Sequence, residues 1–96
     1  MHAITDGRDT PPQSGQRYLA TVEHALKDAG YPPVASVMGR FWAMDRDHRW
    51  ERVERAYRCL VGDDLNFADT ATNAVVRAYD APENPALKGD EFIPPT

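Results

Sequence analysis

Four side chains of this 96-residue sequence have the chemistry to bind a small acidic ligand: Arg8, Asp9, Arg40 and Arg46. Arginine presents paired N–H donors that match carboxylate and phosphate groups, and nearby cations keep an aspartate ionised. An ionised aspartate can accept a hydroxyl proton or orient a hydroxyl group. These residue types therefore suit a site for a small hydroxylated acid that carries a phosphate, in which Asp9 would accept a proton from a hydroxyl or orient it.

The first part of the chain predicts a β-α-β unit that would position these residues. Residues 2–5 are predicted to form a short strand, and apolar residues at helical spacing predict a helix over about 14–29 that ends at Gly30. The apolar run over 34–38 predicts a buried strand. This order normally gives two parallel strands joined by a right-handed crossover.

The carboxyl ends of two parallel strands lie at the same edge of their sheet. Arg8 and Asp9 follow the first predicted strand, and Arg40 follows the second. Arg46 lies in the stretch 41–48, which is predicted to be a turn. We therefore expect residues distant in the sequence to meet at one edge of the sheet.

Two alternatives remain open at this point. The stretch from Asp6 to Pro12 is also typical of an ordinary surface turn, because Asp-Gly and Pro-Pro mark turns of many kinds. The charges of Arg8–Asp9 and of Asp45–Asp47 are also typical of a surface ion-pair network that holds no ligand.

A second helix is predicted over residues 48–61, with Asp47 as its N-cap. Glutamates four residues before Arg55 and Arg58 predict ion pairs on a solvated face. The opposite, apolar stripe of this helix consists of Trp50, Val53, Tyr57, Leu60 and Val61.

The last third of the chain predicts one more helix, over about 70–79, capped by Asp69 or Thr70. Its small side chains suggest close packing. The segment 80–90 is rich in proline and polar residues, and 91–95 is predicted as a short extended edge piece because proline limits strand pairing.

Composition narrows the class of protein. The net charge of −4 disfavours a nucleic-acid-binding surface, and no run of apolar residues is long enough for a membrane span. Cys59 is the single cysteine and is expected to act as a small buried hydrophobe. With no visible secretion signal and no metal-binding histidine spacing, the expectation is a cytoplasmic α/β domain, or part of one, without a metal site.

Two long motifs resemble the cofactor-independent (2,3-bisphosphoglycerate-independent) phosphoglycerate mutases. The first is HAITDGRDTPP over residues 2–12, and the second is GRFWAMDRDHRWERV over residues 39–53. The closing DEFIPPT, residues 90–96, is similar to the end of the same region in that family. The resemblance covers essentially the whole chain.

The resemblance implies that residues 1–96 are a fragment of one α/β phosphotransferase domain, a partial three-layer α/β domain that binds substrate. The intact enzymes are glycolytic isomerases that interconvert 2- and 3-phosphoglycerate through a phosphoserine. That serine and two manganese ions lie in a second, alkaline-phosphatase-like domain that is absent here. By the same resemblance, Arg8, Arg40 and Arg46 bind the acidic groups of the substrate, and Asp9 contacts the glycerate hydroxyls and moves protons.

The implied partners are 2- or 3-phosphoglycerate and the missing metal-binding domain. The fragment itself is expected to bind no manganese and to lack turnover, because the family's nucleophile, metal ligands and a substrate-binding histidine motif lie outside it. Two other functions remain open: a stand-alone module that binds small anions, and a non-functional fragment that forms homo-oligomers through exposed sheet edges.

Overall fold

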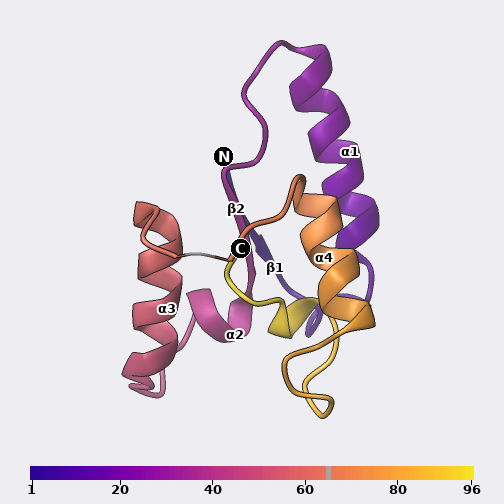
Figure 1. The fold of residues 1–96 in the computed structure, drawn as a ribbon. Helices are drawn as coiled ribbons and strands as arrows, with labels where there is room; N and C mark the ends of the chain where they lie inside the picture. The colour runs from indigo at the N-terminus through magenta and orange to yellow at the C-terminus, as the bar shows by residue number, and fades with distance from the viewer. Residues whose placement is uncertain (65) are drawn as a thin grey trace.

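In the computed structural model the chain forms a small α/β unit around two parallel strands (Figure 1). The structure describes residues 1–64 and 66–96. Helices α1 and α4 pack side by side on one side of the strands, and α2 and α3 lie on the other (Figure 1). The elements are β1 (His2–Thr5), α1 (Gly15–Asp28), β2 (Ser36–Gly39), α2 (Arg40–Ala43), α3 (Trp50–Val61), α4 (Ala71–Asp80) and the 3-10 helix η1 (Asp90–Phe92).

The strand pair confirms the predicted β-α-β unit. His2 lies opposite Ser36 and Thr5 opposite Gly39, in parallel register. Strand β2 begins two residues later than predicted and includes Gly39, and all four of its residues are buried. The carboxyl ends of β1 and β2 therefore meet at one edge, as the parallel order requires.

The segment after η1 runs along the other side of β2. The N–H of Val37 donates to the carbonyl of Thr96, and the N–H of Thr96 donates back to Val37, both at 3.0 Å. The predicted extended piece over 91–95 is therefore partly wrong, since Asp90–Phe92 is helical and only the residues from Ile93 onward lie beside β2. Two prolines in this segment lack the N–H groups that a full strand would need.

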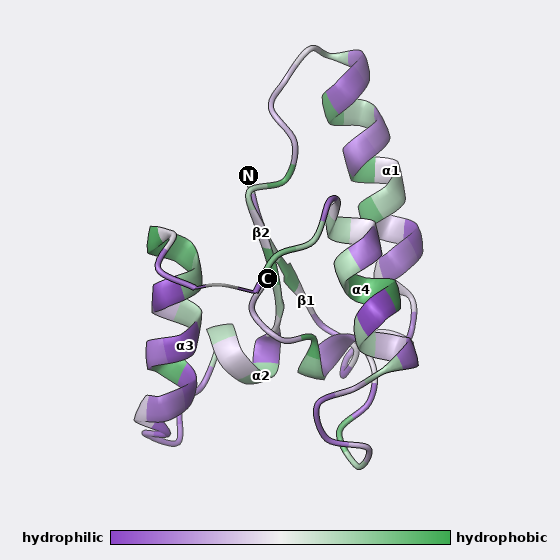
Figure 2. Ribbon diagram, viewed as in Figure 1, coloured by the Kyte–Doolittle hydropathy of each residue, from purple (hydrophilic) through white to green (hydrophobic). Residues whose placement is uncertain are grey.

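The core lies between the strands and the α1–α4 pair, and Figure 2 shows hydrophobic residues on the strands there. The predicted third helix is confirmed within a residue, with Thr70 as its N-cap accepting the N–H of Asn73 at 3.0 Å. Small side chains let the two helices approach closely, as predicted. The buried members of this core are Leu19, Val37, Ala71, Ala74, Val75 and Ile93.

A carboxylate from α1 also caps α4. The Glu23 side chain accepts the N–H of Ala71 at 2.7 Å and the hydroxyl of Thr72 at 2.5 Å. A negative charge is favourable at a helix N-terminus, where backbone N–H groups lack partners. This contact fixes the register of the two helices.

The stretch between β2 and α3 differs from the predicted turn. Residues Arg40–Ala43 form the one-turn helix α2, and α3 begins at Trp50 with Arg49 as its N-cap. His48 has a positive φ of 58°, which a continuing helix does not allow. The predicted capping role of Asp47 is therefore wrong, and the Asp45 carboxylate accepts the N–H of Arg49 at 2.9 Å instead.

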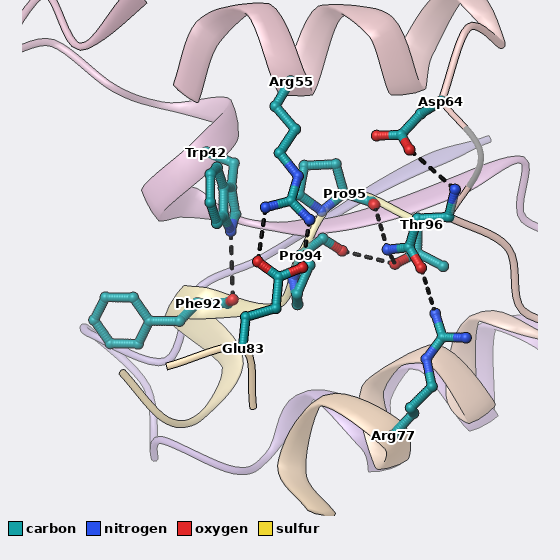
Figure 3. Close-up of polar contacts among 10 residues, drawn as sticks. Trp42, Arg55, Asp64, Arg77, Glu83, Phe92, Pro94, Pro95 and Thr96 are labelled. Carbon is teal, nitrogen blue, oxygen red and sulfur yellow. Dashed lines mark hydrogen bonds and ion pairs between the residues drawn. The ribbon is translucent and has the colours of Figure 1, made fainter. Parts of the chain in front are cut away.

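Helix α3 turns Arg55 toward the body of the molecule. The Arg55 guanidinium binds both carboxylate oxygens of Glu83, in the loop after α4, and lies 4.6 Å from the Trp42 ring centre (Figure 3). The prediction of a solvated, locally paired Arg55 is therefore wrong, because the distant Glu83 takes its place. The Glu54–Arg58 pair is confirmed at 3.0 Å.

Cys59, on the same helix, is only partly buried, and burial raises the pKa of its thiol. No helix within the described residues is long and apolar enough to cross a membrane.

Candidate functional site

The three arginines predicted for the site line one shallow cavity of about 90 Å³. Arg8 follows β1, Arg40 opens α2 directly after β2, and Arg46 lies in the loop before α3. The parallel strands bring these three loops to one edge of the sheet, as the sequence pattern predicts. The remaining lining residues are Phe41, Met44, Asp45, Asp47, Arg52 and Glu91.

Arg40 is the best-anchored member of the set. Its Nη1 atom lies 2.5 Å from Oδ1 of Asp6 and 2.8 Å from Oδ2 of Asp9. Asp9 is thus joined to the cavity through Arg40, although Asp9 itself does not line it. Its side chain is 79% exposed, so it is accessible to a ligand hydroxyl.

Asp6 is a site residue that the sequence analysis missed. Its Oδ1 atom holds Arg40, and its Oδ2 atom accepts the N–H of Asp9 at 3.3 Å. The hydrogen bond from Arg40 holds the pKa of Asp6 below its ordinary value, and the same contact raises the pKa of Arg40. An aspartate three residues before a second aspartate in an Asp-Gly turn is typical of such a side-chain-to-backbone turn.

The turn itself is tightly fixed. The Thr10 hydroxyl accepts the N–H of Gly7 at 3.1 Å, and Gly7 has a positive φ of 66°. A Cβ atom on Gly7 would lie 2.7 Å from the Cβ of Asp90, so this turn packs against the start of η1. This packing distinguishes it from an ordinary surface turn.

Arg52 is a second residue that the sequence analysis did not assign to the site. Its guanidinium carbon lies 3.7 Å from the centre of the Phe41 ring, and its Nη1 atom lies 3.4 Å from Asp45, whose side chain is almost fully buried. Asp45 therefore pairs with α3, and not with the neighbouring Arg46 as the ion-pair alternative supposed. No pattern in the sequence singled Arg52 out from the other arginines of the helix.

Arg8 and Arg46 differ from Arg40 and Arg52 in their pairing. Over residues 1–64 and 66–96, no ion pair holds either Arg8 or Arg46. Both are exposed, so their guanidinium groups are accessible to an anion from solvent. In the same described part of the chain, no three His, Cys, Asp or Glu side chains are grouped as metal ligands.

The lowered pKa of Asp6 predicts a pH dependence of stability. A carboxyl whose pKa is lower in the folded than in the unfolded chain stabilises the fold above its ordinary pKa of 3.8, and this contribution is lost as the pH falls through the folded value. We expect the wild-type free energy of unfolding to fall more steeply between about pH 5 and 2 than that of Asp6→Asn. Urea unfolding across this range measures both.

The matched control for this series is Asp63→Asn, at an exposed aspartate for which the structure gives no ion pair in its described part. It should keep the wild-type slope. Equal slopes for wild type and Asp6→Asn would show that Arg40 does not stabilise the Asp6 carboxylate.

The parallel strand pair, with arginines gathered at its carboxyl edge, defines the class of protein: an α/β unit with an arginine-lined cavity. Comparison with known proteins identifies the family. The sequence model described as "BPG-independent PGAM N-terminus (iPGM_N)" matches residues 1–96. The chain belongs to the family of 2,3-bisphosphoglycerate-independent phosphoglycerate mutases, as its two motifs indicated.

Individual relatives agree with this assignment. The chain is 51% identical to the 2,3-bisphosphoglycerate-independent phosphoglycerate mutase of Syntrophotalea carbinolica, over 99% of this chain, and 50% identical to that of Chromobacterium violaceum, over 100% of it. It spans 18% of the length of each of these relatives.

A solved structure supports the same assignment. The crystal structure of Leishmania mexicana phosphoglycerate mutase at low cobalt concentration superposes with a TM-score of 0.77 and 32% sequence identity. The match covers 98% of this chain and 18% of that one. The fold of this chain is therefore shared with part of that phosphoglycerate mutase.

Proposed function

We propose that this chain is the substrate-binding part of a phosphoglycerate mutase, an isomerase of glycolysis that interconverts 2- and 3-phosphoglycerate through a phosphoserine. The observation that carries the proposal is that Arg8, Arg40 and Arg46 line one cavity in a chain that matches the family over residues 1–96. On this proposal residues 1–96 are one piece of the phosphotransferase domain of a cytoplasmic enzyme.

The chemistry of the ligand fits the pairing of the arginines. A phosphoglycerate carries one phosphate, one carboxylate and one hydroxyl group. Arg8 and Arg46, which no ion pair holds in the described structure, would each bind an acidic group with paired hydrogen bonds. Arg40 has five N–H donors, and the contacts to Asp6 and Asp9 use only its Nη1 atom.

Asp9 would handle the proton of the glycerate hydroxyl. It is exposed and its Oδ2 atom accepts a hydrogen bond from Arg40, so its other carboxylate oxygen is open to accept a hydrogen bond from a hydroxyl and to take up its proton. By the family resemblance, the two manganese ions and the serine nucleophile are proposed for the separate metal-binding domain. No step assigned to this chain involves them, and the chain alone is expected to lack turnover.

A titration of the 96-residue chain with 3-phosphoglycerate, followed by NMR, tests the binding role. We expect saturable shifts at Arg8, Asp9, Arg40 and Arg46. Arg46→Ala should weaken binding at least about tenfold, since a hydrogen bond to a charged group contributes roughly 1.5–3 kcal/mol.

Arg17→Ala is the matched control, because Arg17 is an exposed arginine on α1, where it lies over the Tyr18 ring. It should leave the affinity unchanged. Sulfate serves as the control ligand, and shifts no different from those with sulfate would refute specific recognition and favour the small-anion-binding alternative. Measurable mutase turnover by the pure chain would contradict the expected inactivity.

A further inference from the structure

Helix α3 presents its apolar stripe to solvent. Its single buried residue is Ala56, at 6% exposure. Figure 2 shows hydrophobic residues on α3, at the outer side of the molecule away from α1 and α4. The exposed fractions of the stripe are 67% for Trp50, 38% for Val53, 63% for Tyr57, 47% for Leu60 and 56% for Val61.

Ion pairs on the inner side fix this orientation. Arg52 pairs with the nearly buried Asp45, and Arg55 binds Glu83 through two hydrogen bonds (Figure 3). The hydrogen bonds with Arg55 lower the pKa of Glu83, so this pair is charged at neutral pH. Turning α3 to bury its apolar stripe would break both pairs, and the stripe therefore stays outside.

The stripe has the spacing of a surface that packs against another element. The first four residues of the stripe are spaced three, four and three positions apart, and Val61 lies four positions after Tyr57, which places all five on one side of a helix. The His48 ring stacks on Trp50 with centroids 5.4 Å apart and extends the patch at its amino end. Single exposed apolar side chains are ordinary, whereas a contiguous patch of this kind marks an interaction surface.

We propose that the α3 stripe docks against the remaining polypeptide of a full-length mutase, on an apolar face outside the region that this chain matches. Such polypeptide exists in the relatives, since the matched region makes up 18% of their length. The proposal rests on family membership and does not depend on the substrate site. The rim of the stripe carries the Glu54–Arg58 pair, so a partner with an apolar centre and little net charge fits it.

The area of the stripe argues against a second copy as its occupant. Two aromatic and three aliphatic residues, which are 38% to 67% exposed, offer roughly 500 Å² per copy. A stable interface between separate proteins buries about 800 Å² per partner. A segment of the same polypeptide needs less area, because the covalent connection gives it a high effective concentration.

The test compares the 96-residue chain with a chimera in which it replaces the matching region of the Syntrophotalea carbinolica enzyme, to which it is 51% identical. Hydroxyl-radical labelling of Trp50 and Tyr57 should be at least fivefold lower in the chimera than in the isolated chain. Tyr31 is the internal reference, because it is 67% exposed and lies away from α3. Equal labelling of the stripe in both proteins would overturn the proposal.

A pair of matched variants gives a second readout. Tyr57→Glu and Tyr31→Glu should both leave the thermal stability of the isolated chain nearly unchanged, because each places a charge at a solvent-exposed position. In the chimera, Tyr57→Glu should lower the melting temperature, since the docked face would bury the charge, and Tyr31→Glu should not lower it.

The two variants also report on the oligomeric state by analytical ultracentrifugation. A wild-type dimer that dissociates in Tyr57→Glu and persists in Tyr31→Glu would make a second copy the occupant and would overturn the proposal. A monomer in all three forms is the expected result.

Discussion

Replacement of Asp90 by alanine is expected to lower the free energy of unfolding by about 3 kcal/mol, a large part of the stability of a domain of this size. The Asp90 side chain is 1% exposed. Its Oδ2 atom accepts the N–H groups of Ser14 at 2.9 Å and Gly15 at 2.7 Å, and its Oδ1 atom accepts the Tyr79 hydroxyl. Alanine would leave all three donors unpaired.

Asp90 is thus the true cap of α1. Ser14 occupies the N-cap position but makes no capping hydrogen bond with its own side chain. Burial and the hydrogen bond to Asp90 raise the pKa of Tyr79 well above its ordinary value, so the phenol remains a donor throughout the neutral range. One carboxylate therefore joins α1, α4 and η1.

Urea unfolding of a graded series measures this effect. Tyr79→Phe removes one of the three donors and should cost about 1 kcal/mol, while Asp90→Asn should fall between Tyr79→Phe and Asp90→Ala. Asp69→Ala, at an exposed aspartate, is the control and should stay within about 0.5 kcal/mol of wild type. A loss below about 1 kcal/mol in Asp90→Ala would contradict the capping role.

The second large effect is expected from Gly39→Ala. A Cβ atom at this position would lie 2.1 Å from the carbonyl oxygen of Glu91, which is a backbone atom and cannot simply rotate away. The backbone φ of Gly39 is −75°, so the cost is steric and comes without conformational strain. We expect a loss of about 2–3 kcal/mol in the free energy of unfolding.

The same substitution should also disturb the candidate site, because Gly39 immediately precedes Arg40. Binding of 3-phosphoglycerate to Gly39→Ala should weaken even at temperatures where the variant is folded, and NMR titration measures it. The control is Gly62→Ala, where no atom lies within 4 Å but φ is 79°. That variant should lose about 1 kcal/mol of stability through strain and keep its affinity. Wild-type stability and affinity in Gly39→Ala would refute the close approach of η1 to β2.

Local sequence patterns predicted most of the elements of this fold. Apolar spacing, together with glycine and proline at the ends, located β1, α1, α3 and α4 within about two residues, and the strand–helix–strand order predicted the parallel pair. The one-turn helix α2 was missed because four residues are too few to show a helical period. The 3-10 helix η1, with three residues, was missed for the same reason.

The orientation of α3 was not predictable from local patterns. An apolar stripe ordinarily faces the core, and the contact that reverses this helix is between Arg55 and Glu83, which are 28 residues apart. The cap of α1 by Asp90 spans 75 residues to Gly15 and is equally invisible in a local window. Long-range charged contacts therefore account for the largest differences between expectation and structure.

The residues of the candidate site also fall into two groups, those that the sequence predicted and those that it did not. The sequence predicted Arg8, Arg40 and Arg46 as site residues because the carboxyl ends of parallel strands lie at one edge of a sheet. The structure places all three on one cavity. Asp6 and Arg52 were not named, because their importance lies in side-chain contacts across the sheet edge and onto Phe41. The ligand roles of the named residues stay predictions until they are tested.

Strand β2 lies between β1 on one side and the segment 93–96 on the other, and this arrangement sets the order of events during synthesis (Figure 1). The N–H of Val37 cannot form its hydrogen bond with the carbonyl of Thr96 until Thr96, 59 positions later in the chain, has left the ribosome. Until then the nascent chain exposes one edge of its most buried strand, and Thr5 lacks its contact with the carbonyl of Asp90. Closure of this unit is therefore a late, non-local event, and chaperone protection would matter most in the interval before residue 96 emerges.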